Sequence, residues 1–184
     1  MKYSITTAIV TVVGLASPTI ASTITFTNNC NFLVYYQHAW HKGEGEKSIA
    51  LAPNGGKDYE DMKEIIEADG TAIGAAIKFH RGDGLTSGIL QFEYTKERDG
   101  TMRVPGIYWN FSHVDGARSG VPGPSPFDNS GVMAIPVGTG RGVGSCTDIH
   151  CEAGEVCSGS FLFDLDNTKV KVSDPTATAG NQAS

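Results

Sequence analysis

Hydrophobic and polar residues alternate along many short segments of the chain, as they do in β-strands that bury one face. Leu90 and Phe92, for example, flank the polar Gln91. Patterns of this kind predict strands over 23–28, 32–38, 48–52, 71–80, 88–95, 106–111, 131–137 and 168–172. The segment 58–67 is ambiguous, because its spacing suits a short helix as well as the start of a strand. Many short strands separated by Gly-rich turns predict an all-β fold, a β-sandwich.

The same alternation assigns side chains to the two faces of the predicted sheets. Phe92 and Trp109 fall on the apolar faces of their strands, so we expect both in the core. Gln91 and Asn110 fall on the opposite, polar faces. The segment 32–38 is apolar on both faces, which predicts a strand that is buried on both sides.

The N-terminal residues 1–21 have the features of a secretory signal peptide. Lys2 supplies the positive start, and the segment 5–16 is mainly apolar. Thr19 and Ala21 are small enough for the recognition site of signal peptidase, which predicts cleavage before Ser22. The alternative is that this segment anchors the chain at its N-terminus.

The rest of the chain is long enough for one domain with a substantial core, over residues 22–172, followed by a flexible polar tail over 173–184. We expect a secreted, extracellular monomer without a membrane span, because no later segment has about 20 apolar residues in a row. The net charge of −6 and the lack of a basic stripe argue against a nucleic-acid partner. No cofactor is expected.

Four cysteines in a secreted chain predict two disulfides. They are Cys30, Cys146, Cys151 and Cys157. Cys30 lies far from the other three, so we expect one bridge to tie the N-terminal strand to the C-terminal third. Zinc binding is the weaker interpretation, because the compartment is oxidising and no C-x-x-C pair occurs.

Five short motifs, in order along residues 23–157, resemble motifs of thaumatin-like proteins. They are Thr-Phe-Thr-Asn-Asn-Cys-Asn-Phe-Leu-Val-Tyr-Tyr (25–36), Leu-Ala-Pro-Asn-Gly-Gly (51–56), Ile-Leu-Gln-Phe-Glu-Tyr (89–94), Gly-Ile-Tyr-Trp-Asn-Phe-Ser-His-Val-Asp-Gly (106–116) and Ser-Cys-Thr-Asp-Ile-His-Cys (145–151). The short length and few cysteines resemble the small fungal branch, which includes yeast-phase-specific and spore-germination proteins. The resemblance implies a thaumatin-like β-sandwich with a reduced loop-rich disulfide region.

Larger members of this family carry an acidic cleft, and the resemblance implies where its residues would fall here. The cleft Arg falls on Arg81 and one cleft Asp on Asp115. The cleft Glu and the other Asp fall on Gln91 and Asn110, whose amides cannot act as a general acid or as a carboxylate nucleophile. Glu93, further along the strand of Gln91, is the remaining carboxylate that could pair with Asp115 in a weak catalytic dyad.

Three further features concern adhesion, glycosylation and metal binding. Arg81, Gly82 and Asp83 form the tripeptide that integrins recognise, although a plain hairpin turn explains it as well. Asn110-Phe111-Ser112 is the N-glycosylation sequon of the chain. His38 and His41 could hold a metal ion with a third ligand, but an ordinary strand end is the simpler interpretation, so no metal is expected.

These observations leave three classes of function open. The first is a non-catalytic cell-wall protein that binds wall polysaccharide, β-glucan or chitin, and acts in conidial germination or wall remodelling. The second is a weak endo-β-1,3-glucanase that uses Glu93 and Asp115. The third is a virulence or adhesion ligand that engages a host cell-surface receptor through Arg81–Asp83. We prefer the first, because the fold signature is present while two catalytic carboxylates are replaced by amides.

Overall fold

The computed structural model describes residues 8–14, 22–39, 47–82, 87–97, 106–115, 121–137, 141–142, 144–155, 160–161 and 171–173. This part of the chain contains strands and no helix, which confirms the expected all-β fold. The strands are β1 (Ala8–Gly14), β2 (Ser22–Asn28), β3 (Val34–Ala39), β4 (Ile49–Leu51), β5 (Gly56–Asp61), β6 (Ala75–His80), β7 (Leu90–Glu97), β8 (Gly106–Ser112), β9 (Val132–Pro136), β10 (Ile149–Cys151) and β11 (Lys171–Ser173).

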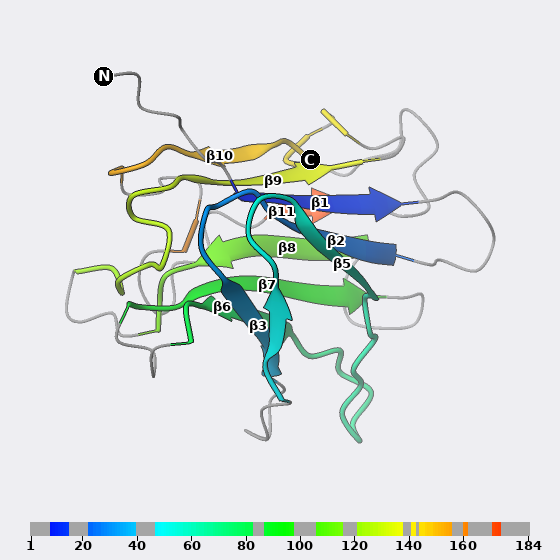
Figure 1. Ribbon diagram of the computed structural model, residues 1–184. Coiled ribbons are helices and arrows are strands. Elements are labelled where there is room, and N and C mark those ends of the chain that lie inside the picture. Colours follow the sequence, from blue (N-terminus) through cyan, green and yellow to red (C-terminus); the bar gives the residue numbers. More distant parts are fainter. Residues whose placement is uncertain are drawn as a thin grey trace.

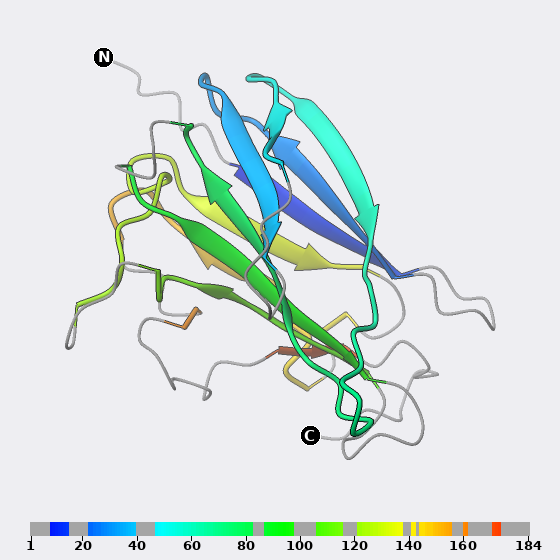
Figure 2. The same ribbon diagram turned by 90° about the horizontal axis from the view of Figure 1, so that it is seen from below.

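The strands form two sheets that lie as two layers (Figure 1). One sheet has five strands in the order β10-β9-β1-β2-β5, and the other has six in the order β11-β8-β7-β6-β3-β4. Seen from below, the green strands β6, β7 and β8 cross one side of the molecule, with the blue β1 and β2 and the yellow β9 on the other (Figure 2). Except for β1 with β9, neighbouring strands of both sheets run antiparallel.

The core lies between the two sheets and is rich in aromatic side chains. Phe26 of β2 packs edge-on against Phe79 of β6, with ring centroids 5.4 Å apart. On the same side of the six-stranded sheet, Phe92 stacks on Trp109 at 5.9 Å and meets Phe111 at 6.1 Å. Phe92 and Trp109 are therefore inward-facing, as the alternation predicts.

Strand β3 differs from the prediction that it is buried on both sides. Val34 and Tyr36 point into the core, whereas Leu33, just before the strand, is 45% exposed and Tyr35 is only half-buried. The outer face of the six-stranded sheet is open at this point, so apolar residues there do not imply a second layer. The strand is buried on one face.

Two other segments also differ from their predicted bounds. The ambiguous segment 58–67 begins as a strand, since β5 ends at Asp61. The predicted strand 71–80 is shorter, because the turn at Asp69 occupies its start: the Thr71 N–H donates to Asp69 Oδ1 at 2.9 Å. Only Ala75–His80 forms β6.

Polar side chains join the two sheets beside the aromatic core. The Tyr36 hydroxyl on β3 donates to Asp58 Oδ2 on β5 at 2.8 Å. His38 Nε2, two residues further on, contacts Glu60 Oε2. Burial and the two neighbouring carboxylates raise the pKa of Tyr36, so its hydroxyl remains a donor over the whole physiological range. Strands β3 and β5 belong to different sheets, so these contacts hold the two sheets together.

The cysteines do not follow the expected pairing. Cys30 and Cys146 are buried thiols, and Cys151 is disulfide-bonded. The predicted bridge from Cys30 to the later cluster is therefore not formed in this structure. Cys30 instead closes the turn after β2, where its N–H donates to Asn28 Oδ1 at 3.0 Å and its thiol lies beside Ser130. Burial raises the pKa of this thiol. Cys157 lies outside the described residues.

Strand β1 comes from the segment that the sequence predicts to be a signal peptide. It pairs antiparallel with β2 and parallel with β9, and so occupies the middle of the five-stranded sheet. Cleavage before Ser22 stays a prediction. No helix among the described residues is long and apolar enough to cross a membrane.

The burial of the core aromatics predicts a large difference between two truncations. Trp109→Ala removes a side chain that is 1% exposed, and we expect it to lower the free energy of unfolding by about 3–5 kcal/mol. Tyr59→Ala removes a side chain that is 74% exposed and should change it by less than about 0.5 kcal/mol. Urea denaturation measures both. Equal effects of the two variants would contradict this placement of the core.

Candidate functional site

The outer face of the six-stranded sheet is polar where β6, β7 and β8 lie side by side. Because side chains alternate along a strand, Ile77, Phe92 and Trp109 in the core leave their chain neighbours on the outer face. These neighbours are Lys78 on β6, Gln91 and Glu93 on β7, and Tyr108 and Asn110 on β8.

The strand register places four of these side chains in two rows across the sheet, and Tyr108 lies in a third row, opposite Thr95. Gln91 lies opposite Lys78 on one side and opposite Ser112 on the other. In the next row, Glu93 lies opposite Asn110. Directly opposed Cβ atoms are about 4.5–5.5 Å apart, and successive positions on one face of a strand are about 6.6 Å apart. The two rows therefore form one continuous patch.

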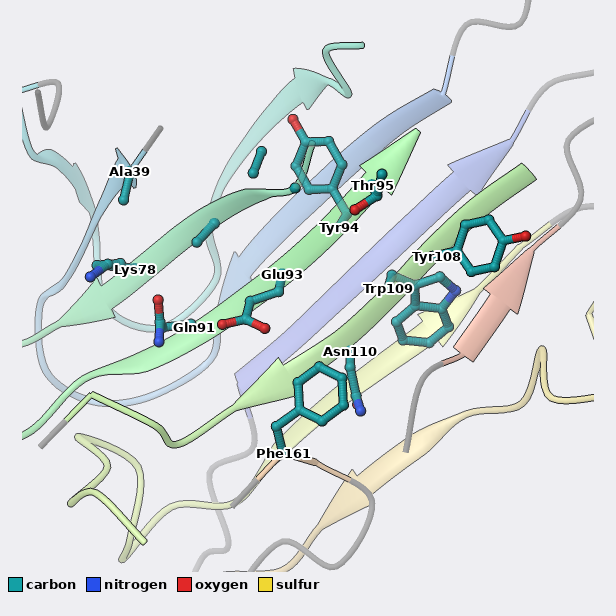
Figure 3. Close-up of a pocket in the computed structure, with 13 residues that line it drawn as sticks. Ala39, Lys78, Gln91, Glu93, Tyr94, Thr95, Tyr108, Trp109, Asn110 and Phe161 are labelled. Atoms are coloured by element: carbon teal, nitrogen blue, oxygen red, sulfur yellow. The ribbon is translucent and has the colours of Figure 1, made fainter. Parts of the chain in front are cut away.

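A cleft of about 400 Å³ lies over this patch. Its lining includes Lys78, Glu93, Thr95, Tyr108, Asn110 and Phe161. Figure 3 shows Lys78, Gln91 and Glu93 next to one another on β6 and β7, with Asn110 on β8 beyond them. The volume is within the usual range for sites that bind small molecules.

Phe161 forms a wall of the cleft although it lies far along the chain. Its N–H donates to the Phe111 carbonyl at 2.9 Å, and its own carbonyl accepts from the His113 N–H at 2.8 Å. These two bonds continue the pairing of β8 at Ser112, on the edge that β11 pairs earlier along the strand. The aromatic wall is thus fixed by backbone hydrogen bonds.

Asp115 lies near the cleft and is neutralised by a lysine. Its Oδ2 is 2.8 Å from Lys78 Nζ, and the two side chains are 28% and 24% exposed. A pair with this exposure contributes about 0.2–1 kcal/mol to stability. Among the described residues that line the cleft, Glu93 is the carboxylate. Glycoside hydrolysis normally needs two carboxyl groups, and the amides of Gln91 and Asn110 do not supply the second.

Gln91 and Asn110 line the cleft but expose little of their side chains. Gln91 is 4% exposed and Asn110 is 1% exposed. Asn110 Oδ1 also accepts from the Phe111 N–H at 2.9 Å. The amides therefore form the floor of the cleft. Contact with a ligand falls mainly to Lys78, Glu93 and Tyr108, which are more exposed.

The structure places Arg81 away from the described lining of the cleft. Its guanidinium lies 3.8 Å from the centre of the Phe32 ring, in a cation–π contact. Gly82 has a φ of +79°, and a Cβ there would come within 2.5 Å of the Tyr35 ring, so the position requires glycine. Arg81 and Gly82 are both exposed, and Asp83 lies outside the described residues, so the adhesion hypothesis stays a prediction.

The metal hypothesis gains no support within the described residues. No group of three His, Cys, Asp or Glu side chains among them is close enough to hold a metal ion. His38 is engaged by Glu60. His41 lies outside the described residues.

Sequence reasoning missed Lys78, Thr95 and Phe161 as lining residues. Lys78 and Thr95 lie on the outer faces of β6 and β7, so the alternation that identified Gln91 carried the signal for both. No pattern in the sequence places Phe161 next to β8, because that contact joins segments about 50 residues apart.

Comparison with known proteins yields one likeness of fold. No protein-family model matches the chain, and no curated protein matches it. The crystal structure of the protein elicitor MoHrip2 from Magnaporthe oryzae is similar, with a TM-score of 0.52, 18% sequence identity and coverage of 90% of each chain. At this identity the likeness shows a shared β-rich fold alone. The thaumatin-like resemblance stays a prediction.

The burial of Asn110 predicts that its sequon is unused. A glycan on a side chain that is 1% exposed, in the middle of β8, would disrupt the strand and the floor of the cleft. We therefore expect protein from a glycosylating eukaryotic host to keep its mass after treatment with N-glycosidase. A loss of mass that maps to Asn110 would contradict this placement of β8.

Proposed function

We propose that this protein is a secreted, extracellular or cell-wall protein of the thaumatin-like type that binds β-glucan of the wall without cleaving it. The observation that carries the proposal is the cleft over the outer face of β6, β7 and β8. Its exposed residues offer charged and hydroxyl groups around a buried amide floor, while its described lining includes a single carboxylate.

The chemistry of the cleft suits a neutral polysaccharide. Sugar hydroxyls both donate and accept hydrogen bonds, and the cleft offers a cationic donor in Lys78, an acceptor in Glu93 and hydroxyls in Thr95 and Tyr108. The apolar faces of a pyranose ring pack on aromatic side chains, which Tyr108 and Phe161 provide. An open face of a sheet is also accessible to a polymer that runs past both ends of the cleft.

The absence of a second carboxylate from the described lining favours binding over hydrolysis. An inverting or a retaining enzyme requires a pair of carboxyl groups at a fixed separation. Asp115, the candidate partner of Glu93, is held by Lys78. A binding protein of this kind fits a role in wall remodelling or conidial germination, which the resemblance to the small fungal branch implies.

The structural likeness to MoHrip2 does not decide between binding of wall polysaccharide and recognition by a host. MoHrip2 is described as a protein elicitor, and that description belongs to MoHrip2. The alternative is that the protein is a ligand recognised by a host. Binding of the protein to host cells would test this alternative independently.

A sedimentation assay with insoluble β-1,3-glucan tests the proposal. We expect the wild-type protein to bind, and the double variant Lys78→Ala/Tyr108→Ala to bind about tenfold more weakly, equivalent to about 1.4 kcal/mol. The matched control is Lys57→Ala/Tyr59→Ala, which removes the same residue types from exposed positions of β5. Equal binding by the two double variants would place the glucan elsewhere.

A reducing-sugar assay on the same samples separates binding from hydrolysis. We expect no sugar release by the wild-type protein. Release that is abolished by Glu93→Gln, with the fold intact by circular dichroism, would establish the glucanase alternative instead.

A further inference from the structure

A second pocket, of about 430 Å³, lies beside the end of β8 and shares no described lining residue with the cleft. It is built from the segment between β8 and β9 and from the turn after β10. The polar residues of its lining are His113, Asp128, Asn129 and Glu155. Val121, Pro122 and Pro124 supply apolar walls.

Backbone hydrogen bonds fix the shape of this pocket. The Gly123 N–H donates to the His113 carbonyl at 2.7 Å, and the Ile89 N–H donates to the Pro124 carbonyl at 3.0 Å. The Gly154 N–H donates to the Asp128 carbonyl at 2.5 Å. A Cβ on Gly123 would lie 1.9 Å from the Asp115 carbonyl oxygen, so the two segments touch at their main chains. The pocket is therefore preformed.

The ring of His113, a residue that lines this pocket, has one nitrogen without a hydrogen-bond partner. The residue is 8% exposed, and its Nε2 is closed off from solvent without a hydrogen-bond partner. The Gly123 backbone hydrogen-bonds the ring, and because Nε2 has no partner, Nδ1 is the ring atom that makes this bond. Burial lowers the pKa of His113, which keeps the imidazole neutral. Its proton then lies on Nδ1, and Nε2 keeps a lone pair.

The polar groups among the described residues of the pocket are mainly acceptors. The Asp128 and Glu155 carboxylates accept hydrogen bonds and carry negative charge, and Nε2 of His113 accepts as well. No lysine or arginine is among the described residues that line the pocket. A ligand that satisfies His113, Asp128 and Glu155 together donates several hydrogen bonds and carries positive charge. A protonated primary amine has three donors and one charge.

We propose that this pocket binds an amino sugar, with its ammonium group toward Asp128, Glu155 and Nε2 of His113. The amide of Asn129 can hydrogen-bond the hydroxyl groups of a sugar, and Val121, Pro122 and Pro124 can pack on the apolar face of its ring. Glucosamine units of a deacetylated wall polysaccharide have this chemistry. The site is distinct from the cleft on β6, β7 and β8, so the inference does not depend on glucan binding there.

Because Nε2 is covered, binding includes a small adjustment of the side chains around it.

The full chain is titrated with glucosamine, glucose, N-acetylglucosamine and n-butylamine, with calorimetry as the readout. We expect glucosamine to bind at least about tenfold more tightly than glucose or N-acetylglucosamine, which lack the ammonium group. Equal binding of the three sugars overturns the proposal. Binding of n-butylamine as tight as that of glucosamine overturns the sugar part and points to amines in general, including lysine side chains.

Charge-matched variants locate the binding site. Asp128→Asn and Glu155→Gln should each weaken glucosamine binding about tenfold. Asp61→Asn removes the same charge from an exposed position of β5 and should leave binding unchanged. Equal loss in all three variants would mean that net charge alone attracts the amine, which contradicts a specific site.

The ring of His113 gives a readout in the unmodified protein, which avoids variants that fail to fold. Long-range proton–nitrogen NMR spectra should show a neutral His113 with its proton on Nδ1. Glucosamine should shift the Nε2 resonance, while glucose at the same concentration should not. A resonance that glucosamine leaves unchanged overturns the role of His113.

Discussion

The inward placement of Phe92 fixes the position of the candidate cleft. Its ring meets Trp109 and Phe111 of β8 in the core, and its backbone pairs β7 with β6 on one side and with β8 on the other. A slip of one residue would bring this ring to the surface and would turn Gln91 and Glu93 into the core. The outer face of the sheet is therefore polar because its inner face is aromatic, and the same register sets the rows of the cleft.

The structure uses polar side chains in two different ways. Between the sheets, the contacts of Tyr36 with Asp58 and of His38 with Glu60 are partly shielded from water. Each contact gives a hydrogen-bonding partner to a polar group that would otherwise have none at the edge of the core. On the outer face of the six-stranded sheet, the amides of Gln91 and Asn110 form the floor of the cleft, although little of either residue is exposed to solvent. A mutation that breaks a contact between the sheets should lower the stability of the protein, whereas a change at the exposed rim of the cleft should alter ligand binding.

The alternation of residues was sufficient to identify β7 and β8 as strands and to place Trp109 in the core. It also placed Gln91 and Asn110 on one face, because both assignments depend only on neighbours along the chain. It could not reveal that Lys78 pairs with Asp115 or that Phe161 lies beside β8, since these contacts depend on loops that return to the sheet. The apolar outer residues of 32–38 misled the prediction for β3, because exposure of that face depends on whether anything packs over it.

The position of β1 has a consequence for how the protein is produced. Residues Ala8–Gly14 lie between β2 and β9 and pair with both strands. Each of these strands has β1 as its only neighbour on the side that faces the other. A chain that starts at Ser22 would have two facing rows of open N–H and C=O groups in the middle of the five-stranded sheet. Rows of this kind attract further strands, from the same chain or from another molecule. The predicted cleavage before Ser22 and a recombinant start at Ser22 would thus have the same effect, a greater tendency of the protein to self-associate.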